Sequence, residues 1–308
     1  MKKMNNRTLA IILAVILILF IGTKLYRASA EKAGMHTEVF SVKADQITKI
    51  VIRPDAAPAQ TVSLEKASSG WQVTDGTTTD KVESGSVEDM LPALSRMEAA
   101  RLVSRKKKDR DSYGVGDSTG THVVLYHDHT PLAEFWVGAD NGAPGQSATY
   151  VRMRGKDDIY QAAAGYLASS LDKPFDQWRD PTFLRIEGSR ITRVHFLYPA
   201  DTGFTLQKEH GKWLIDGIAE DSGKVASYVD RLAYQSLHHF VSHFTPPANP
   251  TLEISVGNDS TQLAVVDAWK TDSTWTLTSS TRPNVYFSSQ GSDIISKLFV
   301  GKSSLAGK

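Results

Sequence analysis

Apolar and polar residues alternate in short runs along the chain after residue 46. The runs Ile47–Ile52, Val62–Leu64 and Gly70–Val73 are rich in β-branched, aromatic and leucine residues and are bounded by polar or glycine-containing segments. This pattern is typical of half-buried strands. The first part of the chain therefore predicts a three-stranded antiparallel start with one apolar face.

The period of the pattern changes between Ser84 and Met97. Serines and acidic residues stand first, and Met90, Leu91, Leu94 and Met97 follow at helical spacing. Serine caps and early acids favour the start of a helix. We therefore expect a helix here that covers the sheet.

A second kind of unit follows, made of strands joined by turns. Val123–Tyr126 and Leu132–Val137 flank a turn at Asp128–Pro131, which predicts a hairpin. Further along, two strands and then a helix are predicted over Thr149–Met153, Asp158–Tyr160 and Ala162–Leu171.

The C-terminal half repeats this order. Mostly apolar and aromatic positions match: Ile47–Ile50 with Ile191–Val194, Trp71 with Trp213, Arg101–Ser104 with His239–Ser242, Thr121–Leu125 with Thr251–Ser255, Leu132 with Leu263, Tyr150 with Trp275, and Tyr160 with Tyr286. Helices are predicted near Ser222–Ser236 and over Asp293–Phe299. Such self-similarity indicates a tandem duplication. The predicted fold class is α+β, with mainly antiparallel strand and helix modules at residues 41–180 and 181–308, joined around Asp172–Pro181.

The N-terminus predicts membrane targeting. Lys2, Lys3 and Arg7 precede the apolar run Leu9–Gly22, and residues 1–28 are expected to form a single transmembrane helix followed by a linker at 29–40. The alternative is a signal peptide cleaved after Ala30, because Ala28-Ser29-Ala30 fits the small-x-small pattern. Either form places the body outside the cytoplasm.

Composition narrows the classes of function. The formal charge is +1 with 22% charged residues, which argues against nucleic acid as a partner. The chain has no cysteine, so disulfides, thiolate catalysis and thiolate-bound zinc are excluded.

Two histidine clusters are candidates for metal sites. His127 and His129 would share a face on a strand, but they fall at the predicted hairpin turn. His239 and His243 have the spacing of two helix ligands, but the intervening glutamate of zinc proteases is missing and the predicted helix ends there. Neither cluster is assigned as a metal site.

Two glycine-containing segments are candidates for phosphate-binding loops. Val300–Ser303 resembles the end of a phosphate loop, but Ser296 stands where the first glycine is needed and the segment follows a predicted helix. Gly138–Gly145 is interpreted as a hairpin loop, since no strand-to-helix transition follows it. The sequence therefore assigns no catalytic residue, cofactor or metal ligand.

The densest run of charge lies between Arg101 and Arg110. It is interpreted as a solvated connector, with contact to anionic lipid heads or an acidic partner as the alternative. The candidate interaction surface drawn from this region comprises Arg105, Lys106, Lys107, Lys108, Tyr113 and Gly114.

The chain resembles the bacterial envelope family known as domain of unknown function 4340. The features that carry the resemblance are Ile47–Ile52, Leu64–Lys66 before Gly70-Trp71, Ala99–Val103 before Asp111–Val115, Phe135–Gly138, Tyr150–Arg152, Ile159-Tyr160 and Phe175–Asp180. The resemblance implies a protein of the bacterial inner membrane with its body in the periplasm. It also implies an accessory role beside ABC-type exporters related to gliding-motility systems, with the permease and ATPase as partners.

The leading functional hypothesis is a non-enzymatic, membrane-anchored scaffold that serves such a transport system. The alternative is a periplasmic glycan- or cell-wall-binding protein or hydrolase that acts through Gly138–Gly145 and nearby aromatic residues. A mechanical spacer is the third possibility.

Overall fold

The computed structural model describes residues 37–139, 148–199, 202–219 and 222–306. The chain divides into two compact units, unit 1 at residues 1–179 and unit 2 at residues 180–308, next to the predicted junction. The predicted anchor at Leu9–Gly22, the cleavage site and the Gly-rich loop beyond Ala139 lie outside the described residues. Within the described ranges, no helix has the length and apolar character needed to cross a membrane.

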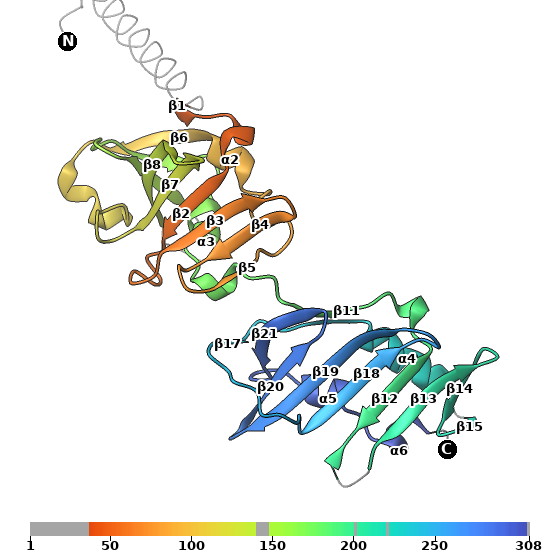
Figure 1. Cartoon of the computed structure of the whole chain (residues 1–308). Helices are drawn as coiled ribbons and strands as arrows, with labels where there is room; N and C mark the ends of the chain where they lie inside the picture. Colours follow the sequence, from red (N-terminus) through yellow and green to blue (C-terminus); the bar gives the residue numbers. More distant parts are fainter. Residues whose placement is uncertain (1–36, 140–147, 200–201, 220–221, 307–308) are drawn as a thin grey trace, which may run out of the picture. The chain divides into compact units, whose positions relative to one another are not determined.

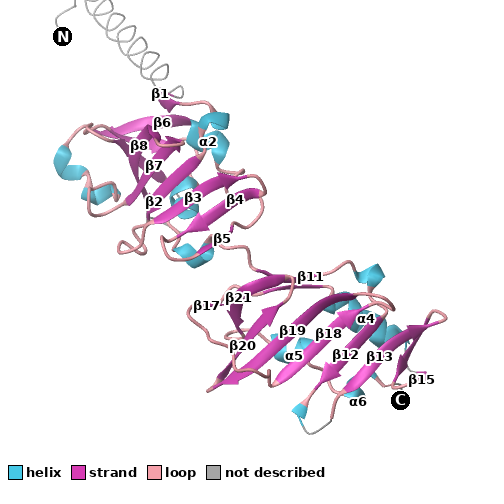
Figure 2. Ribbon diagram, in the orientation of Figure 1, coloured by secondary structure: helices cyan, strands magenta, loops and turns pink. Residues whose placement is uncertain are grey.

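Unit 1 is built on one sheet of ten antiparallel strands (Figures 1 and 2). The strands in spatial order are β1 (Thr37–Ser41), β6 (Arg96–Ser104), β10 (Ile159–Ala162), β9 (Thr149–Met153), β8 (Thr130–Ala139), β7 (Thr121–His127), β2 (Lys49–Arg53), β3 (Val62–Ala67), β4 (Gly70–Thr74) and β5 (Thr79–Lys81). Two short helices, α2 (Leu91–Ser95) and α3 (Leu167–Leu171), contribute buried residues to the core on one face of this sheet.

Unit 2 has a sheet of nine antiparallel strands. In spatial order they are β15 (Ile218–Ala219), β14 (Lys212–Ile215), β13 (Phe204–Glu209), β12 (Arg193–Leu197), β18 (Leu252–Gly257), β19 (Gln262–Thr271), β20 (Thr274–Ser279), β21 (Arg282–Ser288) and β17 (Phe240–Val241). A separate ribbon pairs β11 (Thr182–Arg185) with β16 (Tyr234–Ser236). The helices are α4 (Ser222–Leu232), α5 (Ile294–Leu298) and α6 (Lys302–Leu305).

The two sheets have the same strand order. Starting from β5 in unit 1 and β15 in unit 2, three hairpin-connected strands lead to β2 or β12, and four further strands follow in matching order. Unit 1 has one nine-residue strand, β6, where unit 2 has two short strands, β16 and β17. In unit 2, β11 pairs with β16, just as β1 pairs with β6 in unit 1. The predicted repeat is thus visible as a shared topology.

The sheet register corrects part of the residue matching. Val151 pairs with Val137 in unit 1, and Leu277 pairs with Ala268 in unit 2, so Thr276, not Trp275, corresponds to Tyr150. Because a shift of one residue moves a side chain to the other face of a sheet, Tyr150 lies in a small cluster on the second face, whereas Trp275 packs against the main core. The same shift applies to Tyr160 and Tyr286, and to Thr121–Leu125 and Thr251–Ser255.

The helices are shorter than predicted, and the fold is mainly antiparallel β with a few short helices. Residues 84–90 form turns, α2 begins only at Leu91, and β6 begins at Arg96. Met97 is buried from a strand, because its backbone pairs with Phe40 of β1. Ala162 likewise ends β10, so the predicted helix over Ala162–Leu171 is reduced to α3.

Two other boundaries also change. The predicted linker over 29–40 was wrong at its C-terminal end, because residues 37–40 belong to β1. In unit 2, the helix predicted near Ser222–Ser236 ends at Leu232, and Tyr234–Ser236 pairs as β16. The apolar face predicted for this helix is confirmed, since Val225, Tyr228, Val229 and Leu232 are buried.

Candidate functional site

The residues proposed as an interaction surface divide into two groups. After β6 the chain forms the short 3-10 turns η2 (Lys107–Asp109) and η3 (Asp111–Tyr113). Arg105, Lys106, Lys107 and Lys108 are exposed there, and Arg105 lies 3.9 Å from Asp158. Tyr113 and Gly114 are instead half-buried against the second face of the unit 1 sheet, the face opposite its main core.

A close backbone approach fixes the segment 105–120, here called the latch loop, to this second face. Gly114 adopts a left-handed conformation with φ of 61°. A Cβ atom on Gly138 of β8 would lie 2.1 Å from the Tyr113 carbonyl oxygen, so only glycine fits there. The Tyr113 ring meets the Tyr150 ring edge-on, with centroids 4.8 Å apart.

Arg152 of β9 holds the latch loop from beneath. Its side chain is buried, its Nε donates to the Val115 carbonyl oxygen at 2.7 Å, and it pairs with Asp117. Its guanidinium lies 4.1 Å from the centroid of the Trp136 ring. Arg110 joins the loop to the β9–β10 turn through Asp157 at 2.6 Å. The basic run is therefore part structural anchor and part exposed surface.

A polar row continues across the second face of unit 1. The His122 ring contacts the Trp136 ring in a tilted arrangement, with ring centroids 4.7 Å apart. His122 also lies 3.0 Å from Glu134, which pairs with Arg154 as well. Burial alone would raise the pKa of Glu134, but the hydrogen bonds from Arg154 and His122 outweigh it and lower the pKa. This carboxyl group is thus held ionised.

The corresponding face of unit 2 carries different chemistry. Glu253 and Asp267 stand directly opposite each other on β18 and β19. Burial, and then the like charge of Glu253, raise the pKa of Asp267. Near them, the rings of Phe244, Trp269 and Tyr286 contact one another.

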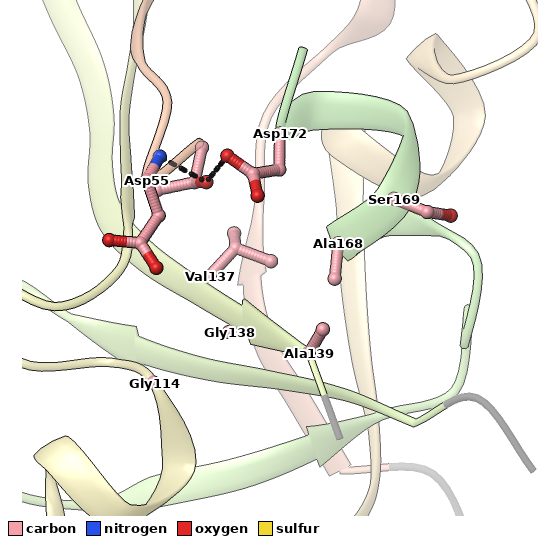
Figure 3. Close-up of a pocket in the computed structure, with 9 residues that line it drawn as sticks. Asp55, Gly114, Val137, Gly138, Ala139, Ala168, Ser169 and Asp172 are labelled. Atoms are coloured by element: carbon pink, nitrogen blue, oxygen red, sulfur yellow. Dashed lines mark hydrogen bonds between the residues drawn. The ribbon is translucent and has the colours of Figure 1, made fainter. Parts of the chain in front are cut away.

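A hollow of about 390 Å³ opens at one end of the unit 1 sheet (Figure 3). It is lined by Asp55, Gly114, Thr121, Val137, Gly138, Ala139, Ala168, Ser169 and Asp172. The Thr121 hydroxyl donates to Asp172 Oδ1 at 3.0 Å and accepts from the Asp55 backbone amide at 3.2 Å. The Ala56 amide also donates to Asp172 Oδ1, at 2.8 Å. Sequence reasoning selected Gly114 and the Gly138 region but missed the two aspartates.

The two histidine clusters lie in a hairpin turn and beside a short strand. Asp128 has φ of 52° in the turn between β7 and β8, which confirms the predicted turn, and His127 Nδ1 lies 2.9 Å from the Gln46 carbonyl oxygen. His239 and His243 flank the strand β17, not a helix. In the described part of the chain, no group of three or more histidine, aspartate and glutamate side chains could hold a metal ion.

The phosphate-loop resemblance at Val300–Ser303 is also explained by structure. The segment follows α5 as predicted, but the short helix α6 begins directly at Lys302, which the sequence did not predict. The Lys302 ammonium donates to Asp216 at 2.8 Å. This lysine therefore ties the C-terminal segment to the β14–β15 turn.

Comparisons with known proteins agree with the resemblance seen in the sequence. No curated protein and no solved structure gave a significant match. A family model matches residues 80–251, which is more than half of the 308-residue chain and runs from β5 of unit 1 to the residue before β18 of unit 2. The chain therefore belongs to the family described as Domain of unknown function (DUF4340).

Proposed function

We propose that this protein is a non-enzymatic, membrane-tethered scaffold of the bacterial envelope, in which a duplicated module presents two different surfaces to partner proteins. The partner class follows from the family resemblance: the permease and ATPase of an ABC-type transport system. The apolar run Leu9–Gly22 after a positive N-terminus supports the tether.

One observation carries the proposal: the two sheets match along a row that faces the core and differ along a row on the opposite, second face. The core-facing row of unit 1 crosses five strands as Val73, Leu64, Ile50, Leu125 and the partly buried Ala133, and that of unit 2 as Ile215, Leu206, Val194, Val256 and Ala264. All these positions are apolar. Interior positions of this kind determine whether the module folds.

The row on the second face behaves differently. It reads Arg53, His122, Trp136 and Arg152 in unit 1, and Leu197, Glu253, Asp267 and Thr278 in unit 2. The second face of unit 1 is therefore basic and aromatic, with Arg53 exposed but Trp136 and Arg152 buried under the latch loop, whereas the second face of unit 2 is acidic along this row. Two different surfaces on one framework are what a protein that bridges two partners needs.

The outer strands β5 and β15 add a second mode of contact. Each is the last strand of its sheet, and Ile218 of β15 is 62% exposed. An edge strand can receive a partner strand through main-chain hydrogen bonds without a special side-chain signature.

Photo-crosslinking in the native membrane tests the proposal. A photoreactive residue at Leu197, 52% exposed in the acidic row, should crosslink to an integral membrane permease or its ATPase, identified by mass spectrometry with the intact N-terminus. The matched control is the same residue at Tyr166, 47% exposed in unit 1 and outside both rows. A processed N-terminus and no crosslinked protein from Leu197 would contradict the scaffold.

A further inference from the structure

The hollow at the end of the unit 1 sheet has a corresponding position in unit 2, so the residues at the two positions can be compared directly. Thr121 pairs with Val137, and Leu252 pairs with Ala268 in the corresponding register. The five-residue helices α3 and α5 also correspond, so Ala168 matches Ile295, and Asp172 matches Phe299.

Unit 2 fills this position with apolar side chains. Leu252, Ile295 and Phe299 all pack against the core, as does Tyr198, the residue after β12. The Tyr198 and Phe299 rings lie 6.4 Å apart, and the Tyr198 hydroxyl donates to the Val300 carbonyl oxygen at 2.8 Å. In unit 2 these positions therefore carry large apolar side chains that pack against the core.

Unit 1 departs from that solution at each of these positions. A threonine, an alanine and an aspartate replace the leucine, isoleucine and phenylalanine, and the space that remains measures about 390 Å³. Small-molecule sites have volumes of about 300–1,000 Å³ and combine apolar walls with a few converging polar groups. Val137, Ala139 and Ala168 supply the apolar wall here.

Two carboxylates line the hollow, together with the neutral hydroxyl residues Thr121 and Ser169. Asp172 is oriented by the Thr121 hydroxyl and the Ala56 amide, which both donate to its Oδ1. Asp55 also lines the hollow (Figure 3). Among the described residues, no ion pair joins either carboxylate to a lysine, arginine or histidine of the chain. An ammonium group would supply the positive charge and the three N–H donors that two such carboxylates accept.

We propose that this hollow binds a primary ammonium group carried on a short aliphatic stem, with Asp55 and Asp172 as the charge partners and Val137, Ala139 and Ala168 against the stem. This binding activity goes beyond the scaffold role. The ammonium group comes either from a free small amine or from a lysine side chain of a partner protein, and both sources share the same recognition chemistry.

The experiment is a titration of the full-length, isotope-labelled protein in detergent, followed through the backbone amide signal of Ala56, which bonds to Asp172. The probes are butylammonium and 1,5-diaminopentane as free amines, and a short blocked peptide with one lysine. Butanol and butyrate control for the aliphatic stem and for salt. Saturable shifts with the free amines, but not with the peptide, identify a small-molecule site, and saturable shifts with the peptide identify a lysine side chain.

Variants separate the site from non-specific charge. Asp55→Asn and Asp172→Asn are each expected to weaken amine binding about tenfold or more, the effect of losing one charge-assisted hydrogen bond. Ala168→Ile, which copies the residue of unit 2, is expected to abolish it. Glu88→Gln removes an equal charge from an exposed turn and is expected to leave affinity unchanged.

The proposal is overturned if no amine gives a saturable shift, if butanol shifts the Ala56 signal equally, or if Glu88→Gln weakens binding as much as Asp55→Asn. Asp55 is exposed, so Asp55→Asn is expected to fold even if the more buried variants do not. The outcome is independent of whether membrane partners are found.

Discussion

Arg152 lies beneath the latch loop with its guanidinium 4.1 Å from the centroid of the Trp136 ring. The two residues are cross-strand neighbours on β9 and β8, and Arg152 also donates to the Val115 carbonyl oxygen. A buried arginine, an aromatic face and a loop carbonyl are thus joined in one contact that fixes the loop to the sheet.

Replacing Arg152 should loosen unit 1. Arg152→Met removes the cation–π contact and leaves the Val115 carbonyl without this donor, so we expect a loss of about 2–4 kcal/mol in the free energy of unfolding. Urea unfolding followed by circular dichroism measures it. Arg154→Met is the control, because Arg154 is 71% exposed and its pair with Glu134 contributes about 0–1 kcal/mol. Equal losses in the free energy of unfolding for both variants would show that the buried contacts of Arg152 stabilise the protein no more than the exposed pair of Arg154 does.

The close approach at Gly138 makes a second prediction. Gly138→Ala places a Cβ atom where the carbonyl oxygens of Tyr113 and Gly114 lie, and both are backbone atoms that cannot turn aside. We expect a loss of about 1–3 kcal/mol or more, with faster proteolysis within residues 105–120. In the control Gly301→Ala, the nearest neighbour of the new atom is Ser303 Oγ at 4.0 Å. Unchanged proteolysis of Gly138→Ala would contradict the latch geometry.

The acidic pair of unit 2 predicts a dependence on pH. Asp267 has a pKa raised above its ordinary value of 3.8, first by burial and then by Glu253, so the folded state holds this proton more tightly than the unfolded state. Its contribution is therefore most favourable below the unfolded pKa and is lost as pH rises through the folded pKa. We expect Asp267→Asn to stabilise the protein by about 0.2–1 kcal/mol at pH 7.

The measurement is urea unfolding of wild type and Asp267→Asn between pH 3 and pH 8. The gain should shrink toward acid pH, where Asp267 is protonated in both states. Glu209→Gln, at an exposed position of β13, should give no such pH-dependent gain. A stabilisation that is constant across this range would exclude the carboxylate pair as its cause.

The region matched by the family model does not coincide with either compact unit, and this difference predicts which fragments of the chain fold. Residues 80–251 exclude β2, β3 and β4 from the unit 1 sheet, where β2 lies between β7 and β3, and exclude β18 to β21 from unit 2. We expect a fragment 80–251 to remain unfolded, while fragments 37–179 and 180–306 fold, because each retains its own core. Circular dichroism and dispersion of amide proton signals distinguish these outcomes. A folded 80–251 fragment would show that the two sheets are not the folding units.

Part of the candidate site could be read from the sequence. In the sequence, Gly114 belongs to the candidate interaction surface beside the basic run, and Gly138–Gly145 is interpreted as a hairpin loop. Asp55, Thr121 and Asp172 come from three separate segments, and only the folded sheet end brings them together. The repeat itself contains a signal for this site, because Asp172 and Ala168 of the first copy correspond to the larger apolar residues Phe299 and Ile295 of the second copy. Recognising this difference requires the correct alignment of the two copies.

By itself, the sequence determined the repeat, its mainly antiparallel strands and the identity of most core positions, because burial imposes apolar residues at a fixed period wherever one face of a sheet is covered. Ile50, Trp71, Val194 and Trp213 are all buried as their pattern indicated. Only the tertiary structure decided the ends of the helices and the strand register. Met90, Leu94 and Met97 have the spacing of one helix. In the structure, Met90 lies in a turn, Leu94 in α2 and Met97 in β6, because the backbone of Met97 pairs with β1. Register depends on hydrogen bonds between segments far apart in the chain, which local periodicity does not encode.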